Sequence, residues 1–140
     1  MRARAAVILF KDNKMLLLQH TKDESYYVAP GGHVENGETY EQAAIREIKE
    51  ECNFHIKIIR KIAKGYFKKY NQEEIFFLGE ISGGELTNEF DPDNVYGKLI
   101  TDFLWIDPFK IDLNKTRPKK FFEWYIHNIN EMEEKDLGEY

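Results

Sequence analysis

Short apolar runs separated by polar turns mark the first thirty residues of the chain. Residues 5–10 and 15–19 are apolar on either side of the polar segment 11–14, a pattern typical of a β-hairpin. Residues 26–29 form a further short extended segment, which ends where Pro30-Gly31-Gly32 breaks the pattern. The N-terminal part of the chain is therefore predicted to consist of strands.

Apolar residues then recur at a spacing of three to four, which predicts an α-helix over residues 39–52. Thr39 and Gln42 stand at its start in the arrangement of a capping box. The apolar stripe of this helix consists of Tyr40, Ala44, Ile45, Ile48 and Cys52. One face of the helix is thus expected to pack on the strands.

The second half of the chain mixes strands, loops and one more helix. We expect strands over residues 55–70 (with a bend at Gly65), 74–81 and 102–106, a turn at 82–84 and a long loop at 85–101. Pro118 starts a C-terminal amphipathic helix whose apolar stripe runs to Met132. Because strands and helices do not alternate regularly, we predict one α+β domain over residues 1–140, a mixed β-sheet sandwiched between helices.

Composition and charge narrow the class of protein. The chain has 140 residues, 42% of them hydrophobic, which suits one soluble domain and is too apolar for disorder. No apolar run reaches the roughly 18 residues of a membrane span. Cys52 is the single cysteine, which excludes an intrachain disulfide and fits a cytoplasmic location. The net charge of -5 argues against general nucleic-acid binding, and the acidic residues 131–140 are interpreted as a solvated chain end.

Three glutamates crowd the C-terminal turns of the predicted helix. Glu47, Glu50 and Glu51 are neighbours at spacings of three and four residues, where like charges repel by roughly a few tenths of a kcal/mol. The helix dipole disfavours each of them by about 0.3–1 kcal/mol. One interpretation is a solvated acidic face; the other is a site for a hard cation such as Mg²⁺ or Mn²⁺. The Gly31-Gly32 loop, where a backbone can approach a ligand closely, favours the cation.

The residues around this helix resemble the Nudix box. That signature is a glycine, five residues, Glu, seven residues, Arg-Glu, an aliphatic residue, any residue, Glu-Glu, any residue, a glycine and an aliphatic residue. Here Gly32 and Glu38 open the pattern, and residues 46–54 read Arg-Glu-Ile-Lys-Glu-Glu-Cys-Asn-Phe. Asn53 stands in place of the second glycine. Asparagine tolerates the left-handed conformation almost as well, so the sequence predicts that Asn53→Gly is neutral or slightly stabilising, within about 1 kcal/mol.

The resemblance implies a hydrolase dependent on Mg²⁺ or Mn²⁺, in which water attacks the pyrophosphate linkage of a nucleoside diphosphate derivative. By position, Glu47, Glu50 and Glu51 match the metal-binding glutamates of the family. The backbone carbonyl of Gly31 matches a further ligand. Arg46 matches the arginine that orients and neutralises a glutamate.

The general base of the family is not fixed, because some members use a glutamate of the box and others an acid of a later loop. Within the box we assign Glu50 to catalysis. In the long loop Glu89 is the first candidate and Glu85 the second. Glu38 matches the first glutamate of the box, a more distant partner of the metal cluster.

Substrate choice depends on residues outside the box. Tyr27, Phe67 and Tyr70 are candidates for stacking on a base, and Tyr70 lies where a tyrosine resembles the marker of dinucleoside-polyphosphate hydrolases. The basic stretch 57–69 is interpreted either as a contact for substrate phosphates or as the exposed side of a strand. At most about half of its cations can face one groove, so a small free nucleotide is favoured over a nucleic-acid end.

Two other classes remain as alternatives. A non-catalytic Nudix-like binding or sensor domain would have no need of the intact glutamates and Arg46. An isopentenyl-diphosphate isomerase shares the fold but relies on a catalytic cysteine, whereas Cys52 continues the apolar stripe of the helix. A homodimer is the oligomeric state that we consider for testing.

Overall fold

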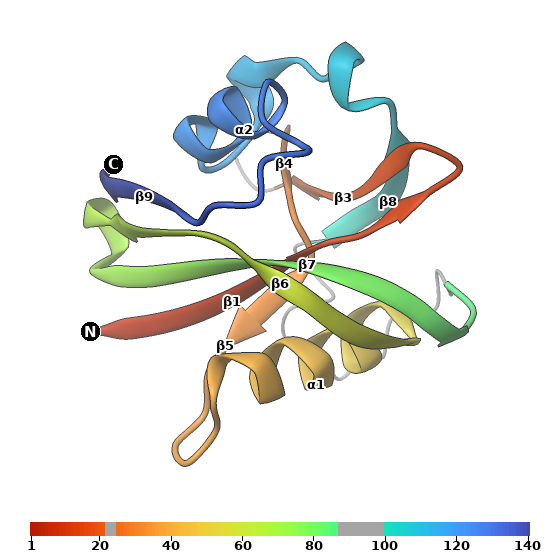
Figure 1. The fold of residues 1–140 in the computed structure, drawn as a ribbon, viewed down its shortest axis with the longest axis horizontal. Coiled ribbons are helices and arrows are strands. Elements are labelled where there is room, and N and C mark those ends of the chain that lie inside the picture. The colour runs from red at the N-terminus through yellow and green to blue at the C-terminus, as the bar shows by residue number, and fades with distance from the viewer. Residues whose placement is uncertain (22–24, 87–99) are drawn as a thin grey trace.

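The computed structural model describes residues 1–21, 25–86 and 100–140. Its strands form two β-sheets. Helix α1 (Tyr40–Cys52) lies under the larger sheet, and α2 (Lys119–Tyr125) lies above it, on the side of the smaller sheet (Figure 1). The predicted α+β arrangement of a mixed sheet between helices is therefore present, with a second sheet that the pattern did not reveal.

The larger sheet has the strand order β5-β1-β7-β6-β9. Its strands are β1 (Arg2–Ile8), β5 (Gly31–His33), β6 (Phe54–Phe67), β7 (Gln72–Gly84) and β9 (Lys135–Glu139). β1 runs parallel to β7 and β9 parallel to β6, whereas the pairs β1–β5 and β6–β7 are antiparallel. The second half of β1 is buried on both faces, which is why it reads as a continuous apolar run.

The smaller sheet contains β2 (Phe10–Lys11), β3 (Lys14–Thr21), β4 (Ser25–Val28) and β8 (Ile100–Ile106), and each of the others pairs antiparallel with β3. The predicted hairpin of residues 5–10 with 15–19 is wrong for most of its length. Only Phe10 and Lys11 pair with β3, whereas the residues before them belong to the larger sheet. An apolar run does not reveal which sheet a strand joins.

Helix α1 begins and ends as the sequence predicts. Thr39 Oγ1 accepts a hydrogen bond from the Gln42 N–H, and Gln42 Oε1 accepts one from the Thr39 N–H, which completes the capping box. At the other end Asn53 takes the left-handed conformation, with φ 59° and ψ 31°. The buried face differs from the predicted stripe at two positions, because Ala43 is buried and Ile45 is 42% exposed.

The C-terminal helix is shorter than its apolar stripe predicts. α2 ends at Tyr125, and the side-chain amide of Asn128 donates to the Trp124 carbonyl (2.7 Å) just beyond its end. Ile129 is half-buried without being helical, and Met132 is 74% exposed. The prediction of a helix reaching Met132 is wrong because a polar side chain takes a carbonyl that the next turn would need.

Residues 131–140, interpreted from the sequence as a solvated end, contain the edge strand β9 instead. Leu137 is 3% exposed in the apolar cluster beneath α2, and the Tyr140 N–H donates to the Tyr66 carbonyl (3.0 Å). Acidic residues surround this one buried leucine, so hydropathy alone concealed the strand.

Two glycines mark close backbone contacts. The turn predicted at residues 82–84 is wrong, since β7 runs on to Gly84, where φ is +86° and a Cβ would lie 2.2 Å from the Asn53 carbonyl oxygen. The bend predicted at Gly65 is a register shift toward β9, and a Cβ there would lie 2.3 Å from a ring carbon of Tyr140. The end of β7 therefore lies against the end of α1, and Tyr140 lies on β6.

Apolar clusters fill both faces of the larger sheet. The cluster that includes α1 contains Cys52, which is buried as the sequence predicts, and Phe77. In the cluster that includes α2, Phe76 stacks on Phe121 with ring centroids 4.0 Å apart. Short 3₁₀ helices lie at Lys68–Tyr70 (η1), Pro108–Lys110 (η3) and Leu113–Lys115 (η4). No helix among the described residues is long and apolar enough to span a membrane.

Candidate active site

Two glycines bring the backbone of β5 against the glutamates of α1. The Gly31 N–H donates to Glu51 Oε1 (3.0 Å), and a Cβ on Gly31 would lie 2.1 Å from the Ala5 carbonyl oxygen. A Cβ on Gly32 would lie 2.4 Å from Glu47 Oε2. A side chain at Gly31 would collide with the backbone of β1, which cannot move aside, whereas one at Gly32 would displace the Glu47 carboxylate.

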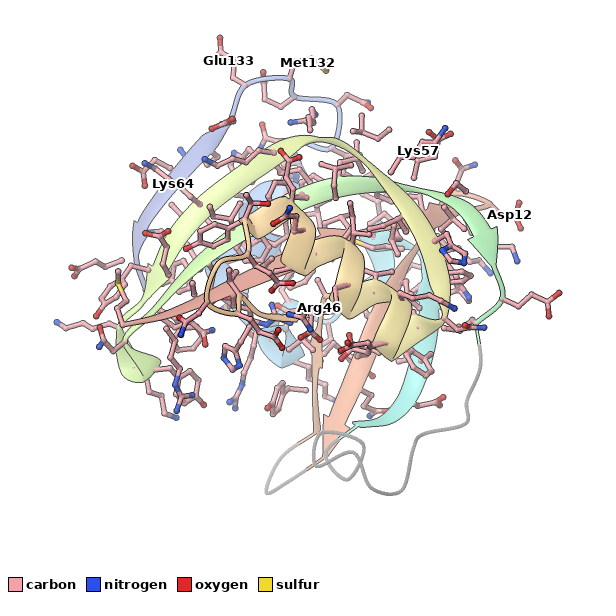
Figure 2. All side chains as sticks on the ribbon, turned by 90° about the horizontal axis from the view of Figure 1, so that it is seen from below. Asp12, Arg46, Lys57, Lys64, Met132 and Glu133 are labelled. Atoms are coloured by element: carbon pink, nitrogen blue, oxygen red, sulfur yellow. The ribbon has the colours of Figure 1, made fainter. Side chains whose placement is uncertain are left out.

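Arg46 joins the carboxylates of the box (Figure 2). Its guanidinium makes two hydrogen bonds to Glu38, from Nε to Oε2 (2.7 Å) and from Nη2 to Oε1 (2.9 Å). Nη1 donates to Glu47 Oε1 (2.9 Å) and Glu50 Oε2 (3.3 Å), and Nη2 also donates to the His33 carbonyl (3.0 Å). One planar cation thus holds three glutamates and the end of β5, a geometry suited to the orienting role predicted for it.

The carboxyl groups differ in how readily they ionise. Burial raises the pKa of Glu51 from 4.5 to about 8, although the Gly31 amide and the charge of Arg4 oppose this shift. Burial also raises the pKa of Glu47, against the effect of Arg46. The hydrogen bonds from Arg46 lower the pKa of Glu38 to about 2. Near neutral pH Glu51 is therefore mostly protonated unless a further cation lies beside it.

The donor set suits a hard divalent cation. The carboxylates of Glu47, Glu50 and Glu51 and the Gly31 carbonyl supply oxygen ligands of the kind that Mg²⁺ and Mn²⁺ take. A cation would also stabilise the ionised form of Glu51, which burial disfavours. In the part of the chain that the structure describes, no three acidic, histidine or cysteine side chains already form a metal cluster. Arg46 binds Glu47 and Glu50, so a cation competes with these two ion pairs.

We expect the stability of the metal-free protein to fall as the pH rises from about 4.5 to about 8. Between these values the folded state keeps the proton of Glu51, whose pKa is raised to about 8, whereas the unfolded state has released it, so the loss of stability is complete once the pH has passed about 8. Thermal unfolding in EDTA measures this change. Glu51→Gln should flatten the pH dependence, and Mg²⁺ should reduce it. An unchanged slope in that variant would assign the effect to other carboxyls.

The acids considered as general base differ in their exposure and contacts. The Glu50 side chain is 59% exposed, with Oε2 3.3 Å from Arg46 Nη1. Glu89 lies outside the described residues. Glu85 is exposed, and its carbonyl oxygen accepts a hydrogen bond from Asn53 Nδ2 (3.0 Å). Of the box glutamates held by Arg46, Glu50 thus offers a carboxylate that water can reach.

Asn53 does more than end the helix. Lys49 Nζ donates to its Oδ1 (2.6 Å), while its Nδ2 binds the Glu85 carbonyl. Asn53→Gly keeps the left-handed conformation but loses both contacts, so we now expect the free energy of unfolding to fall by about 1 kcal/mol. Urea denaturation measures the change. Asn53→Ala, which adds backbone strain, should lower the free energy of unfolding by about 1 kcal/mol more than Asn53→Gly does. If the glycine variant matched the parent, the two contacts would contribute nothing.

The sequence pattern did not indicate a buried ion pair that lies beside the site. Glu74 of β7 is 2% exposed, Arg4 Nη1 lies 3.5 Å from its Oε2, and the Tyr140 hydroxyl donates to its Oε1 (3.2 Å). Arg4 Nη2 donates to the Ala29 carbonyl (2.8 Å), two residues before Gly31. The sequence did contain one indication of this pair: Glu74 stands at a position of its strand where the alternation of side chains points inward.

Of the three aromatic residues predicted to bind substrate, Phe67 lines a hollow of about 540 Å³. We call it the basic pocket, and its lining includes Phe67, Lys69, Arg117, Lys119, Lys120 and Tyr140. The Tyr70 ring packs on Phe67 at the margin of this pocket, with centroids 4.8 Å apart. The Tyr27 carbonyl accepts a hydrogen bond from the Arg117 N–H (2.9 Å), but the Tyr27 side chain packs against the apolar cluster that includes α2.

The cations of this pocket were missed because they come from two segments about fifty residues apart, 67–69 and 117–120. Two cations of the contiguous basic stretch 57–69 bind residues near the C-terminus of the chain. Arg60 Nη2 donates to the Glu131 carbonyl, and Lys61 Nζ lies 3.5 Å from Glu134 Oε2. A run of lysines in the sequence is therefore a poor guide to where positive charge faces a ligand.

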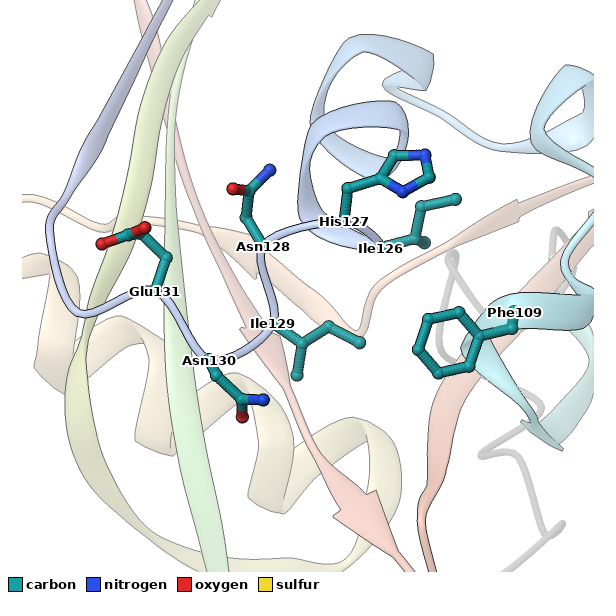
Figure 3. Close-up of a pocket in the computed structure, with 7 residues that line it drawn as sticks. All are labelled: Phe109, Ile126, His127, Asn128, Ile129, Asn130 and Glu131. Carbon is teal, nitrogen blue, oxygen red and sulfur yellow. The ribbon is translucent and has the colours of Figure 1, made fainter.

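A second hollow, of about 530 Å³, lies beside the segment that follows α2 (Figure 3). Phe109, which is 73% exposed, lies across it from Ile126 and Ile129, and Glu131 lies at its margin. Among the residues that the structure describes, its lining contains none of the predicted site residues and neither lysine nor arginine, so this part of the hollow does not suit a phosphate-bearing ligand.

Comparison with known proteins agrees with this site. A family model described as the NUDIX domain matches residues 1–125. The chain belongs to the Nudix family. A Bacillus subtilis (strain 168) protein provisionally named 8-oxo-dGTP diphosphatase is 31% identical over 138 residues, which cover 96% of this chain and 87% of that protein.

Other Nudix relatives are similar over a shorter span. The ADP-ribose pyrophosphatase of Methanocaldococcus jannaschii is 37% identical over 87 residues, which are 56% of this chain and 50% of that protein. The NAD-capped RNA hydrolase NudC of Vibrio atlanticus is 34% identical over 102 residues, 72% of this chain and 35% of that protein. The match thus covers half or less of each of these two relatives.

Solved Nudix structures share the fold. A Nudix hydrolase from Nitrosomonas europaea superposes with a TM-score of 0.72 at 20% identity, covering 98% of this chain and 78% of that one. The solution structure of the E. coli ORF135 protein superposes with a TM-score of 0.71 at 20% identity, covering 94% of this chain and 93% of that one. The predictions of a Nudix fold and of an enzyme of the Nudix hydrolase class are confirmed.

Proposed function

We propose that residues 1–140 form a single Nudix domain that hydrolyses the pyrophosphate linkage of a nucleoside diphosphate derivative with Mg²⁺ or Mn²⁺. The observation that supports the proposal is the Gly31–Glu51 contact next to Glu47 and Arg46, which brings the backbone of β5 against two glutamates of α1. The names of the relatives, a diphosphatase, a pyrophosphatase and a capped-RNA hydrolase, support the same reaction class.

The chemistry follows from the positions of these groups. A divalent cation, when bound, neutralises phosphate oxygens and eases the attack of water. Glu47, Glu50, Glu51 and the Gly31 carbonyl would hold it. As the water oxygen attacks phosphorus and the bridging P–O bond breaks, Glu50 accepts the proton of the water. Arg46 keeps Glu47 and Glu50 in place during this step.

Comparison of Glu50→Gln with Glu89→Gln identifies the base. If Glu50 is the base, its variant should lose about 100-fold in kcat and the Glu89 variant less than about threefold. Single-turnover rates of the two variants measure both losses. The opposite ranking would assign the proton transfer to Glu89.

We propose a small free nucleotide as substrate. A panel of nucleoside triphosphates, nucleotide sugars, dinucleoside polyphosphates and isopentenyl diphosphate, with and without Mg²⁺, tests the proposal by product analysis. Hydrolysis of nucleotides that stops in EDTA is the expected result. Dinucleoside polyphosphates are the second candidate class, because Tyr70 packs on Phe67 at the margin of the basic pocket. Tight binding without turnover would indicate a sensor domain, and conversion of isopentenyl diphosphate an isomerase.

The remaining proposals concern where the enzyme acts and how it assembles. We propose a cytoplasmic location, in keeping with the single buried cysteine and a soluble nucleotide substrate. A homodimer is the assembly to test by light scattering.

A further inference from the structure

Strand β5 has few side chains of its own to hold it against α1. It is three residues long, and its first two residues are glycines. Its position therefore depends on contacts of the backbone. The Gly31 N–H donates to Glu51 Oε1 (3.0 Å). Just before it, the Pro30 carbonyl accepts a hydrogen bond from the Val7 N–H of β1 (2.9 Å).

Two arginines bind the backbone on the two sides of this strand. Arg46 of the box donates to the carbonyl of His33, the last residue of β5 (3.0 Å). Arg4 of β1, which lies outside the box, donates from Nη2 to the carbonyl of Ala29 (2.8 Å), two residues before Gly31. Ala29 is 2% exposed, so its carbonyl needs a donor from within the protein. Arg4 thus fixes the entry to β5, as Arg46 fixes its end.

Arg4 is itself held by a buried carboxylate. In the register of the larger sheet it lies between His33 of β5 and Glu74 of β7. Its Nη1 lies 3.5 Å from Glu74 Oε2, and the Tyr140 hydroxyl donates to the other oxygen of this carboxylate (3.2 Å). A planar guanidinium can bind the carboxylate and the Ala29 carbonyl at the same time, which the single ammonium group of a lysine does not reproduce.

The charge of Arg4 also acts on the glutamates of α1. Burial raises the pKa of Glu51 and that of Glu47, and the positive charge of Arg4 opposes both shifts. Such an effect falls with distance, so Arg4 lies near both carboxyls. Among the residues that the structure describes, its hydrogen bond goes to the backbone before Gly31 and not to these glutamates. Arg4 therefore acts on them through β5 and through its charge.

We infer that Arg4 is a positioning residue for the metal site: it holds the backbone before Gly31 so that Gly31 stays against the glutamates of α1, and Glu74 holds Arg4. The inference rests on the proposed function, which assigns the Gly31 carbonyl and three glutamates of α1 to the metal. Groups that orient metal ligands typically contribute about 10-fold to 100-fold to metal affinity or activity.

Arg4→Lys tests the geometry without a change of charge. The affinity for Mn²⁺, measured from the electron paramagnetic resonance signal of the free ion, should fall at least tenfold. The amide hydrogen of Gly31 should exchange at least tenfold faster, while that of the buried Ile48 in α1 keeps its parental rate. Arg2→Lys is the matched control, an exposed arginine two residues earlier on the same strand, and should change neither quantity.

A double variant separates positioning from a purely structural role, and it covers the case in which Arg4→Lys does not fold. Arg4→Met with Glu74→Gln removes one charge of each sign, so no buried carboxylate loses its partner. A positioning role predicts a folded protein, by circular dichroism, whose affinity for Mn²⁺ remains at least tenfold below that of the parent. Recovery of the parental Mn²⁺ affinity in this variant would overturn the inference.

Kinetics distinguish positioning from contact with the substrate. At a Mg²⁺ concentration that half-saturates the parent, the weaker metal binding of Arg4→Lys should lower kcat at least fivefold. The KM for the nucleotide should stay within about threefold, because Arg4 orients a ligand of the metal. A raised KM at parental kcat would assign Arg4 to substrate binding and overturn the inference.

Parental Mn²⁺ affinity and parental exchange of the Gly31 amide in Arg4→Lys overturn the inference, even if the melting temperature of the variant falls. Both quantities can also change as expected in a protein whose parent hydrolyses no nucleotide of the panel. That result would contradict the proposed function and leave the role of Arg4 in holding Gly31 standing.

Discussion

Replacement of Glu51 by glutamine is expected to lower kcat by about 100-fold or more in saturating Mg²⁺. Glutamine keeps the shape of the side chain but removes the negative charge that a divalent cation requires, and the Gly31 N–H still finds an oxygen to bind. Without metal the variant should be as stable as the parent or more so, because the buried carboxyl of Glu51 no longer has to ionise. Steady-state kinetics and thermal unfolding in EDTA measure the two effects.

Glu41→Gln is the matched control for this substitution. Glu41 is an exposed glutamate in the first turn of the same helix, and its loss should leave kcat within about twofold of the parent. A Glu51 variant that turns over substrate at the parental rate would remove Glu51 from the metal site. A variant that loses both activity and fold would show instead that the carboxyl group holds β5 in place.

Replacement of Arg46 by lysine should lower kcat by about 10-fold to 100-fold and the free energy of unfolding by about 2 kcal/mol. An ammonium group is a single point of charge and does not reproduce the paired bonds to Glu38 together with those to Glu47 and the His33 carbonyl. The carboxylates then lose their orientation, and Glu38 loses the partner that lowers its pKa.

Arg2→Lys is the control, an exposed arginine at the start of β1. It should change neither kcat nor stability beyond about 0.5 kcal/mol. Urea denaturation and kinetics at several Mg²⁺ concentrations separate the two roles of Arg46. If added Mg²⁺ restored the lysine variant fully, Arg46 would act through metal affinity alone. Parental kcat and stability together would contradict the geometry described for Arg46.

The sequence predicted correctly those features that depend on residues close together in the chain. The capping box at Thr39, the left-handed Asn53 and the buried Cys52 follow from rules that span a few residues, and all three are present. The crowding of glutamates on α1 pointed to the site for the same reason, because neighbours on a helix are fixed by spacing alone.

Contacts between distant segments could not be predicted. The partners of Glu74 come from β1 and from the last residue of the sequence, and no local rule connects them. The cations of the basic pocket come from η1 and from the start of α2. The edge strand β9 depends on a single apolar residue, Leu137, too little for any periodicity to indicate.

Strand β6 runs from the candidate active site to the basic pocket, since it begins directly after Asn53 and ends at Phe67. Its pairing with β7 shifts register at three places, and Ile59, 52% exposed, is the extra residue of one of them. Such irregularities absorb one residue without turning the rest of a strand over. Deletion of Ile59 would therefore remove one irregularity and leave the pairs on either side of it in place, so β6 can change in length between its two ends without changing its partners.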